Sequence, residues 1–178
     1  MTYQLIETKT LTSAQAAIEF TSIPQTYTDL IVLFSVRSQR TGANDDPLGF
    51  RLNASNSGYS LRQLSGSGSS VFTVGGSDTA MFCGYAPTAN MTADTFANGS
   101  IYLPNYSGGT NKSSSVEMVG ENNATLAYQT IVANLWSNTG AITSLALLFY
   151  QTSQNFSIGS TVSLYGITRG TDGIVIVS

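Results

Sequence analysis

The eight residues Asp29-Leu-Ile-Val-Leu-Phe-Ser-Val36 (DLIVLFSV) form the most strand-like stretch of this chain. β-Branched and aromatic side chains favour a pleated sheet. Four apolar side chains alternate on one face of the stretch, while Ile31 and Leu33 lie on the other. Apolar residues on both faces indicate a strand that is buried on both sides, or one whose second face is reserved for another subunit.

Short runs of the same kind recur on either side of this stretch. We expect further strands at Ala17–Ile23, Leu48–Asn53, Ser70–Val74, Met81–Tyr85, Thr95–Leu103, Ser115–Val119, Ala127–Trp136, Ile142–Tyr150, Thr161–Ile167 and Ile174–Val177. Strands at this spacing, separated by turn residues, indicate an antiparallel sandwich or barrel rather than βαβ units. Within one run, Asn98-Gly99 predicts a turn or bulge.

One segment has a competing interpretation. Thr12–Phe20 contains three alanines and begins with Thr12 and Ser13, which are suitable helix caps. The β-type run that leads into Ile23-Pro24 opposes a helix, and we therefore predict a strand from Ala17. Pro24 lacks an amide donor and should end the pairing of that strand.

The composition also favours strands with polar turns. Of the 178 residues, 42% are hydrophobic and only 10% are charged, against about 25% charged in a typical domain. Ser, Thr, Asn, Gln and Gly replace the missing charges, which argues against charged helical bundles and coiled coils. The length suits one domain, and we expect a single domain over 1–178.

The charge pattern excludes common classes of partner. Lysine occurs only at Lys9 and Lys112, and the net charge is −3. Nucleic-acid binding needs clustered cations, so we expect no nucleic-acid partner. No apolar run approaches the ~20 residues that span a bilayer, and the first residues do not resemble a signal peptide. We expect synthesis in a cytoplasm, no membrane partner and, with Cys83 as the lone cysteine, no disulfide within the chain.

Catalytic signatures are missing from the sequence. The chain has no histidine, which removes the usual imidazole base and the commonest transition-metal ligand. The adjacent carboxylates Asp45 and Asp46 are interpreted as a turn that opens the next strand, and Glu117 and Glu121 as solvated residues near a strand end. We expect no enzyme activity, no cofactor and no metal, although Asn44-Asp45-Asp46 offers oxygen ligands of the type that Ca²⁺ prefers.

Two stretches resemble a known class of proteins. These are residues 17–38, AIEFTSIPQTYTDLIVLFSVRS, and residues 156–167, FSIGSTVSLYGI. Together they resemble small structural proteins of tailed bacteriophages, in which such strands bracket a jelly-roll-like β-sandwich. The resemblance covers about a fifth of the chain and does not extend to the middle, residues 42–124. It implies an all-β, jelly-roll-like antiparallel β-sandwich and a location in the virion.

The resemblance implies a structural role but leaves the virion part open. Our first hypothesis is a capsid decoration or cement protein that binds the major capsid protein where capsomers meet, as a homo-oligomer for which we expect a trimer. The alternatives are a tail-associated adaptor, fibre or receptor-binding protein, and a carbohydrate-binding module. Tyr59, Tyr85 and Tyr106 would suit ligand binding if exposed, but we expect them to pack over strand ends.

Protein contacts are expected at two places. The two-faced strand 29–36 and an apolar C-terminal strand at 173–178 would serve subunit contacts, because an apolar strand can add to the edge of a partner sheet. Trp136, at the end of a long strand, is interpreted as either core or subunit interface. The predicted interface residues are Ile31, Leu33, Trp136, Ile174, Val175, Ile176 and Val177.

Overall fold

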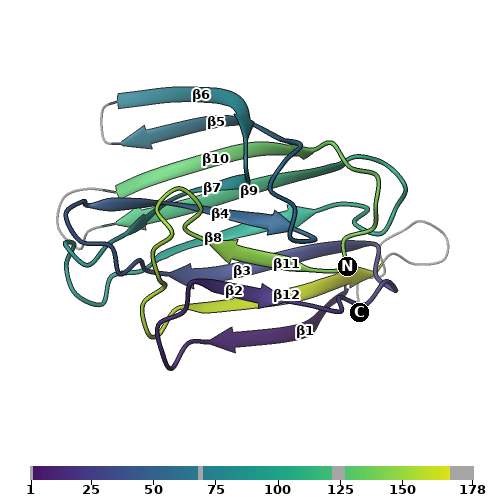
Figure 1. Ribbon diagram of the computed structural model, residues 1–178, viewed down its shortest axis with the longest axis horizontal. Coiled ribbons are helices and arrows are strands. Elements are labelled where there is room, and N and C mark those ends of the chain that lie inside the picture. Colours follow the sequence, from purple (N-terminus) through teal and green to yellow (C-terminus); the bar gives the residue numbers. More distant parts are fainter. Residues whose placement is uncertain (1, 68–69, 122–126, 169–178) are drawn as a thin grey trace.

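The computed structural model describes residues 2–67, 70–121 and 127–168, and this part of the chain forms two antiparallel sheets that pack face to face (Figure 1). The large sheet has the strand order β1-β12-β3-β8-β9-β10-β5-β6. The small sheet has the order β2-β11-β4-β7. The all-β sandwich predicted from the sequence is therefore confirmed.

The strand boundaries follow the chain from end to end. The strands of the large sheet are β1 (Thr2–Thr10), β3 (Asp29–Val36), β5 (Tyr59–Ser67), β6 (Ser70–Asp78), β8 (Ala97–Leu103), β9 (Lys112–Glu121), β10 (Ala127–Trp136) and β12 (Thr161–Thr168). Those of the small sheet are β2 (Ala17–Phe20), β4 (Asp45–Leu52), β7 (Met81–Pro87) and β11 (Leu145–Leu148).

The chain passes repeatedly from one sheet to the other. Among the described strands, only the β5–β6 hairpin and the β8–β9–β10 meander connect neighbours within one sheet. A jelly roll distributes eight strands over its two sheets, whereas the large sheet here contains eight by itself. The jelly-roll assignment therefore stays a prediction.

Alternation of side chains builds the core between the sheets. In β3, Leu30, Val32, Phe34 and Val36 are buried, as the sequence pattern predicts. Aromatic rings fill the centre: Phe34 comes from the large sheet, Phe20 and Phe50 come from the small sheet, and Phe149 and Phe156 come from the segment between β11 and β12. Burial of each such side chain contributes roughly 1.5–3 kcal/mol, so this one continuous core is the main source of stability.

The first strand of the small sheet confirms the strand interpretation of residues 17–20. Strand β2 ends at Phe20, before Pro24, and Ser22 has a left-handed backbone with φ of 54°. The hydroxyl of buried Tyr106 donates to the Pro24 carbonyl and so holds this corner. The Tyr27 ring covers Gly166, where a Cβ would lie 2.3 Å from the ring.

The turn predicted at Asn98-Gly99 is wrong. Both residues lie inside strand β8, in regular register with β3 and β9. A Cβ on Gly99 would lie 2.4 Å from the Glu117 carbonyl oxygen and 2.5 Å from the Phe34 ring. The glycine is therefore required for the close approach of Phe34 and the neighbouring strand, and not for a turn.

Other differences concern strand length. Strands β1 and β5 were not predicted, β6 extends to Asp78, and β11 contains only Leu145–Leu148 of the expected Ile142–Tyr150. Strand β4 begins at Asp45 itself rather than after a turn. The predicted strand Ile174–Val177 lies outside the described residues.

Candidate functional site

The outer face of the large sheet, which points away from the small sheet, carries the first pair of predicted interface residues. Leu33 is 43% exposed, and its register partners are Ser100 on β8 and Ser163 on β12. Ile31 is half-buried on the same face. Strand β3 is thus buried on one face only, and its other face presents aliphatic side chains among hydroxyl groups.

A second apolar group lies on the same outer face, three strands from Leu33 in the sheet order. Ile131 on β10 and Leu64 on β5 are direct register partners, and both are exposed. Leu135 is exposed further along β10. These residues were not among the predicted interface residues, although the alternation within Ala127–Trp136 places Ile131 and Leu135 on one parity.

The β5–β6 hairpin forms one end of the large sheet and extends beyond the small sheet (Figure 1). Ser70 to Ser77 are exposed, so both faces of β6 are open. Val71 is 73% exposed on one face, and Val74 is 49% exposed on the other beside Phe72. Exposed apolar side chains on a sheet edge are typical of a surface that binds another chain.

Trp136 belongs to the core and not to an interface. Its side chain is 2% exposed, and its ring stacks on Tyr59 with centroids 5.8 Å apart. The indole nitrogen donates a hydrogen bond to the Ser57 carbonyl oxygen at 3.2 Å. Of the two interpretations offered by the sequence, the structure supports the core, because so little of the ring is left for a partner. Ile174, Val175, Ile176 and Val177 lie outside the described residues.

The candidate aromatic binders are also mostly internal. Tyr59 and Tyr106 are buried, and Tyr85 is half-buried with its ring edge-on to Phe82 at 5.2 Å. The Tyr59 hydroxyl accepts from the Leu52 amide at 3.0 Å and so ties two strand ends together. None of these three rings lies free on the surface, as expected for residues that pack over strand ends.

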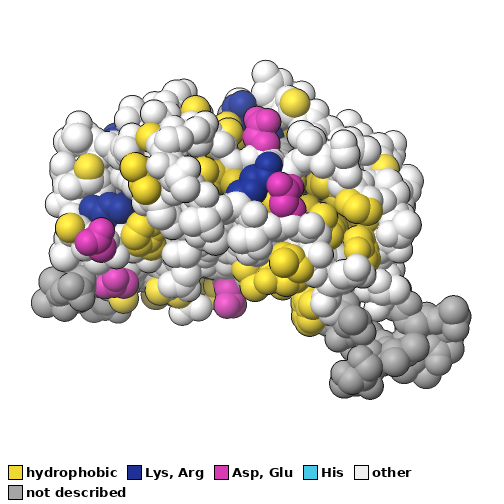
Figure 2. Space-filling model, turned by 90° about the horizontal axis from the view of Figure 1, so that it is seen from below, with side chains coloured by type: hydrophobic (Ala, Val, Ile, Leu, Met, Phe, Trp, Pro, Cys, Tyr) yellow, Lys and Arg dark blue, Asp and Glu magenta, His cyan; other side chains and the backbone are white. Residues whose placement is uncertain are grey.

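Charged groups are sparse around the outer surface. Figure 2 views the molecule from the side of β1 and shows hydrophobic side chains among uncharged polar ones, with few charges between them. On β1, Lys9 pairs with Glu7 at 3.4 Å. A surface of this composition makes hydrogen bonds to a neighbouring protein without the cost of desolvating many ions.

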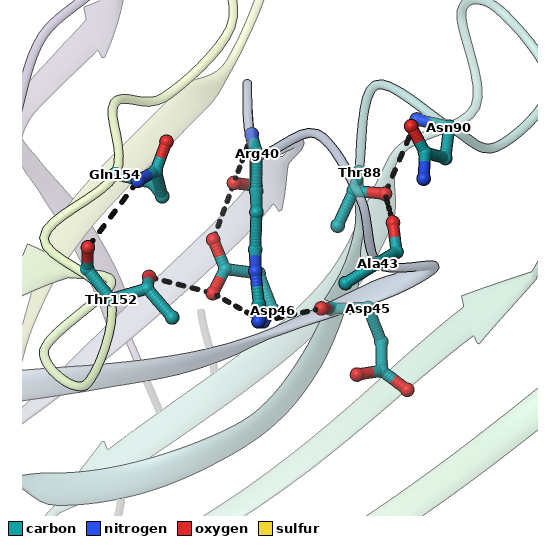
Figure 3. Close-up of polar contacts among 9 residues, drawn as sticks. Arg40, Ala43, Asp45, Asp46, Thr88, Asn90, Thr152 and Gln154 are labelled. Carbon is teal, nitrogen blue, oxygen red and sulfur yellow. Dashed lines mark hydrogen bonds and ion pairs between the residues drawn. The ribbon is translucent and has the colours of Figure 1, made fainter.

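A buried carboxylate organises one end of the small sheet (Figure 3). Asp46 is fully buried and accepts hydrogen bonds from the Ser38 hydroxyl at 2.5 Å and the Thr152 hydroxyl at 2.7 Å. Arg40 lies 3.6 Å from the same carboxylate and also donates to the Asp45 carbonyl oxygen at 3.1 Å. Beside them, the Thr88 hydroxyl donates to the Ala43 carbonyl oxygen at 2.5 Å.

This arrangement binds three chain segments together and leaves no oxygen of Asp46 facing solvent. The other proposed Ca²⁺ ligand of the pair, Asp45, is exposed and points away from this cluster in Figure 3. Among the described residues, no group of three or more acidic, His or Cys side chains is placed to hold a metal ion. Glu117 is exposed on the outer sheet face, as predicted.

Two buried cations hold loops by their carbonyl oxygens. Arg37 donates to the Met91, Thr92 and Thr95 carbonyls at 2.7–2.9 Å. Lys112 is 1% exposed and donates to the carbonyls of Gly108 at 2.6 Å and Thr110 at 2.5 Å. Burial lowers the pKa of Lys112. Burial also lowers the pKa of Arg37, and this effect outweighs the nearby Asp94 carboxylate, which raises that pKa.

The remaining unusual groups are not arranged for chemistry. Cys83 is fully buried, and burial raises the pKa of its thiol well above the ordinary value. A buried protonated thiol is a poor nucleophile. Burial and a hydrogen bond to Asp78 at 2.8 Å raise the pKa of Tyr150. These shifts are explained by packing inside the sandwich.

Comparison of the chain with protein-family models, with curated proteins and with solved structures found no match. In the described part of the chain, no helix has the length and apolar character needed to cross a bilayer.

Proposed function

We propose that this protein is a non-enzymatic structural protein of a bacteriophage virion, and specifically a capsid decoration or cement protein. It would be made in the cytoplasm of a bacterial host and bind the outer shell where capsomers meet. Its partners would be the major capsid protein and further copies of itself.

The observation that carries the proposal is the set of exposed aliphatic side chains on the outer face of the large sheet. Leu33 forms one group, and the register partners Leu64 and Ile131 form a second, with Ser100 and Glu117 between the two groups in the strand register. Exposed apolar groups rimmed by polar residues indicate binding to another macromolecule. The surrounding residues are mainly Ser, Thr and Asn, which suits a broad protein–protein contact with a polar rim.

The resemblance of residues 17–38 and 156–167 to phage structural proteins supports the same proposal. These stretches form β2, β3 and β12 together with the segments that precede β4 and β12. They supply the core residues Ile18, Phe20 and Val32 and the exposed Leu33.

The state of the polar groups favours a structural role over catalysis. Asp46, Arg37 and Lys112 are buried and engaged in hydrogen bonds that hold loops. Catalytic groups instead face a cleft where a substrate can reach them. These three buried charges bind carbonyl oxygens and side chains of the chain itself.

A binding assay with phage shells tests the proposal. Shells of the phage that encodes this chain, assembled without it, are mixed with the purified protein and sedimented. We expect saturable co-sedimentation at hundreds of copies per shell. Leu33→Lys should weaken binding by about tenfold or more, since a buried unpaired charge costs at least ~1.4 kcal/mol. Absence of binding to shells would contradict the proposal.

The tail-associated alternative has a different stoichiometry. A fibre, adaptor or receptor-binding protein would co-purify with tails and appear in a few to a few dozen copies per particle. Quantitative gel densitometry of separated heads and tails distinguishes the two locations, and recovery of the chain with tails alone would favour the alternative.

A further inference from the structure

We propose that β6 is the acceptor edge for the C-terminal segment Gly173–Ser178 of a second copy of this chain, which adds to the large sheet as a ninth strand. The proposal goes beyond the decoration function, because it concerns contacts between copies and needs no capsid. It is argued from the state of the sheet edges, the position at which β12 ends and the sequence of the segment.

Within the described residues, two of the four sheet edges have clear protection against strand addition. Strand β1 has a register irregularity between Leu5 and Glu7 and carries the charged pair Glu7 and Lys9. Bulges and charges of this kind prevent pairing with another chain. Strand β2 contains only four residues, too few for a long partner.

The edge of β7 is closed by a side chain. The Asn134 amide nitrogen donates to the Phe82 carbonyl oxygen at 3.0 Å, and its oxygen accepts from the Phe82 amide at 3.1 Å. Both partners are buried. Asn134 thus imitates the pair of hydrogen bonds that a further strand would make, and no chain can pair with β7 at this point.

Strand β6 is long and has no bulge, although the Arg62 side chain of β5 lies over Gly75 on one face. It is nine residues long, and its register with β5 runs without a shift from Asp78 opposite Tyr59 to Ser70 opposite Ser67. It contains no Lys, Arg or Pro, and its one charged residue, Asp78, lies at its end. A long, uncharged, exposed edge strand is a template for pairing with another chain.

The C-terminal segment has the matching character. Ile174, Val175, Ile176 and Val177 are all β-branched and uncharged, and such residues have high strand propensity. Successive side chains of an added strand point to opposite faces. Each face of β6 offers an apolar neighbour for them, Val71 on one side and Phe72 with Val74 on the other.

The segment cannot reach β6 of its own subunit. Strand β12 ends at Thr168, and β6 lies six strands away in the sheet order. A strand added beyond β6 would be seven spacings from β12, or about 34 Å at ~4.8 Å per strand. The four residues 169–172 span at most about 14 Å. The pairing must therefore join two subunits, in a head-to-tail contact that closes into a ring when its rotation permits.

A complementation experiment tests the proposal in solution. One variant lacks Gly173–Ser178 and keeps only the acceptor, and the other carries Val71→Lys and Val74→Lys and keeps only the donor. Sedimentation equilibrium should show an oligomer for the unmodified chain and a monomer for each variant alone. An equimolar mixture of the two variants should form a one-to-one heterodimer, because it restores one donor and one acceptor.

Matched controls separate association from folding. Circular dichroism should show the same strand spectrum for all chains, and Ile158→Lys, which adds a charge at an exposed loop residue, should leave the oligomer intact. A monomeric unmodified chain would overturn the proposal. An oligomer that survives loss of Gly173–Ser178 would also overturn it, because that result is expected if two β6 edges pair with each other. A mixture of the two variants that fails to associate would overturn it as well. None of these outcomes affects binding of the protein to shells.

Discussion

Single buried charges in this sandwich hold loops in place. Lys112 and Arg37 each point their donors at backbone carbonyl oxygens of neighbouring loops, and Asp46 accepts hydroxyl hydrogens from two other segments. Hydrogen bonds to charged groups contribute about 1.5–3 kcal/mol, roughly twice a neutral bond. A chain with few charges therefore uses several of them inside, where they fix loop geometry.

Lys112→Met should destabilise the protein by about 1.5–3 kcal/mol, because it removes the hydrogen bonds that a buried, charged donor makes to loop carbonyls. Urea unfolding measures the change in the free energy of unfolding. Lys9→Met is the matched control, since Lys9 is partly exposed, pairs with Glu7 and lies 5.5 Å from the centroid of the Phe20 ring. Its effect should stay within about 1 kcal/mol. Equal effects of the two substitutions would show that the hydrogen bonds of Lys112 to the loop carbonyls do not stabilise the fold.

The raised pKa of Tyr150 should make the free energy of unfolding depend on pH. Its pKa is raised in the folded state, so the folded chain keeps the proton when the unfolded chain has lost it. The stabilisation is fully present below the ordinary value of 10.0 and is lost as the pH rises through the higher folded pKa. Tyr150→Phe should cost about 1 kcal/mol at pH 7, through the lost bond to Asp78.

Urea unfolding of both chains at pH 7 and pH 11 measures this effect. The stability difference between the unmodified chain and the Tyr150→Phe variant should shrink at pH 11, because only the unmodified chain has this proton to lose. A difference that grows with pH would mean that the pKa of Tyr150 is lowered on folding.

At the scale of elements, the sequence was informative where side chains alternate clearly. Strands β3, β10 and β12 match the predicted ranges within one or two residues. Strand β1 has polar residues on both parities and strand β5 mixes Ser, Arg and Gln with leucines, so neither shows a periodic apolar pattern. Both form because neighbouring strands pair with them, and this information is not local to their sequences.

The candidate site was also predictable only where apolar side chains follow a clear pattern along a strand. Leu33 was found because the strand that contains it is apolar on both faces. Trp136 was ambiguous, because a large ring at a strand end suits either a core or an interface. The open edge at β6 depends on which strands lie beside it, and a sequence pattern gives no sheet order.

The Asn134 side chain closes the edge of β7 through its two hydrogen bonds to Phe82. Asn134→Leu should cost about 2–3 kcal/mol, because the buried amide and carbonyl of Phe82 lose both partners. Amide hydrogen exchange at Phe82 should become faster relative to the rest of the core. Gln129→Leu, on an exposed position of the same strand, should change neither quantity. Unchanged exchange at Phe82 in Asn134→Leu would show that the edge is protected in another way.

The whole molecule combines one compact core with an unusual exterior. Buried charges serve the chain's own loops, while the outer face and the β6 edge expose aliphatic groups among hydroxyls and amides. A surface of this kind would suit contact with other proteins, as we propose. The proposed decoration function would use the outer face around Leu33, and the proposed pairing of C-terminal segments would use the β6 edge of the same sheet.

Cryo-electron microscopy of the particle encoded with this chain tests the central claim most directly. We predict hundreds of copies on the outer shell at capsomer junctions, with the outer face of the large sheet, around Leu33, against a neighbouring protein. Density for the chain only at the tail, or a shell that carries the chain with this face turned to solvent, would contradict the account.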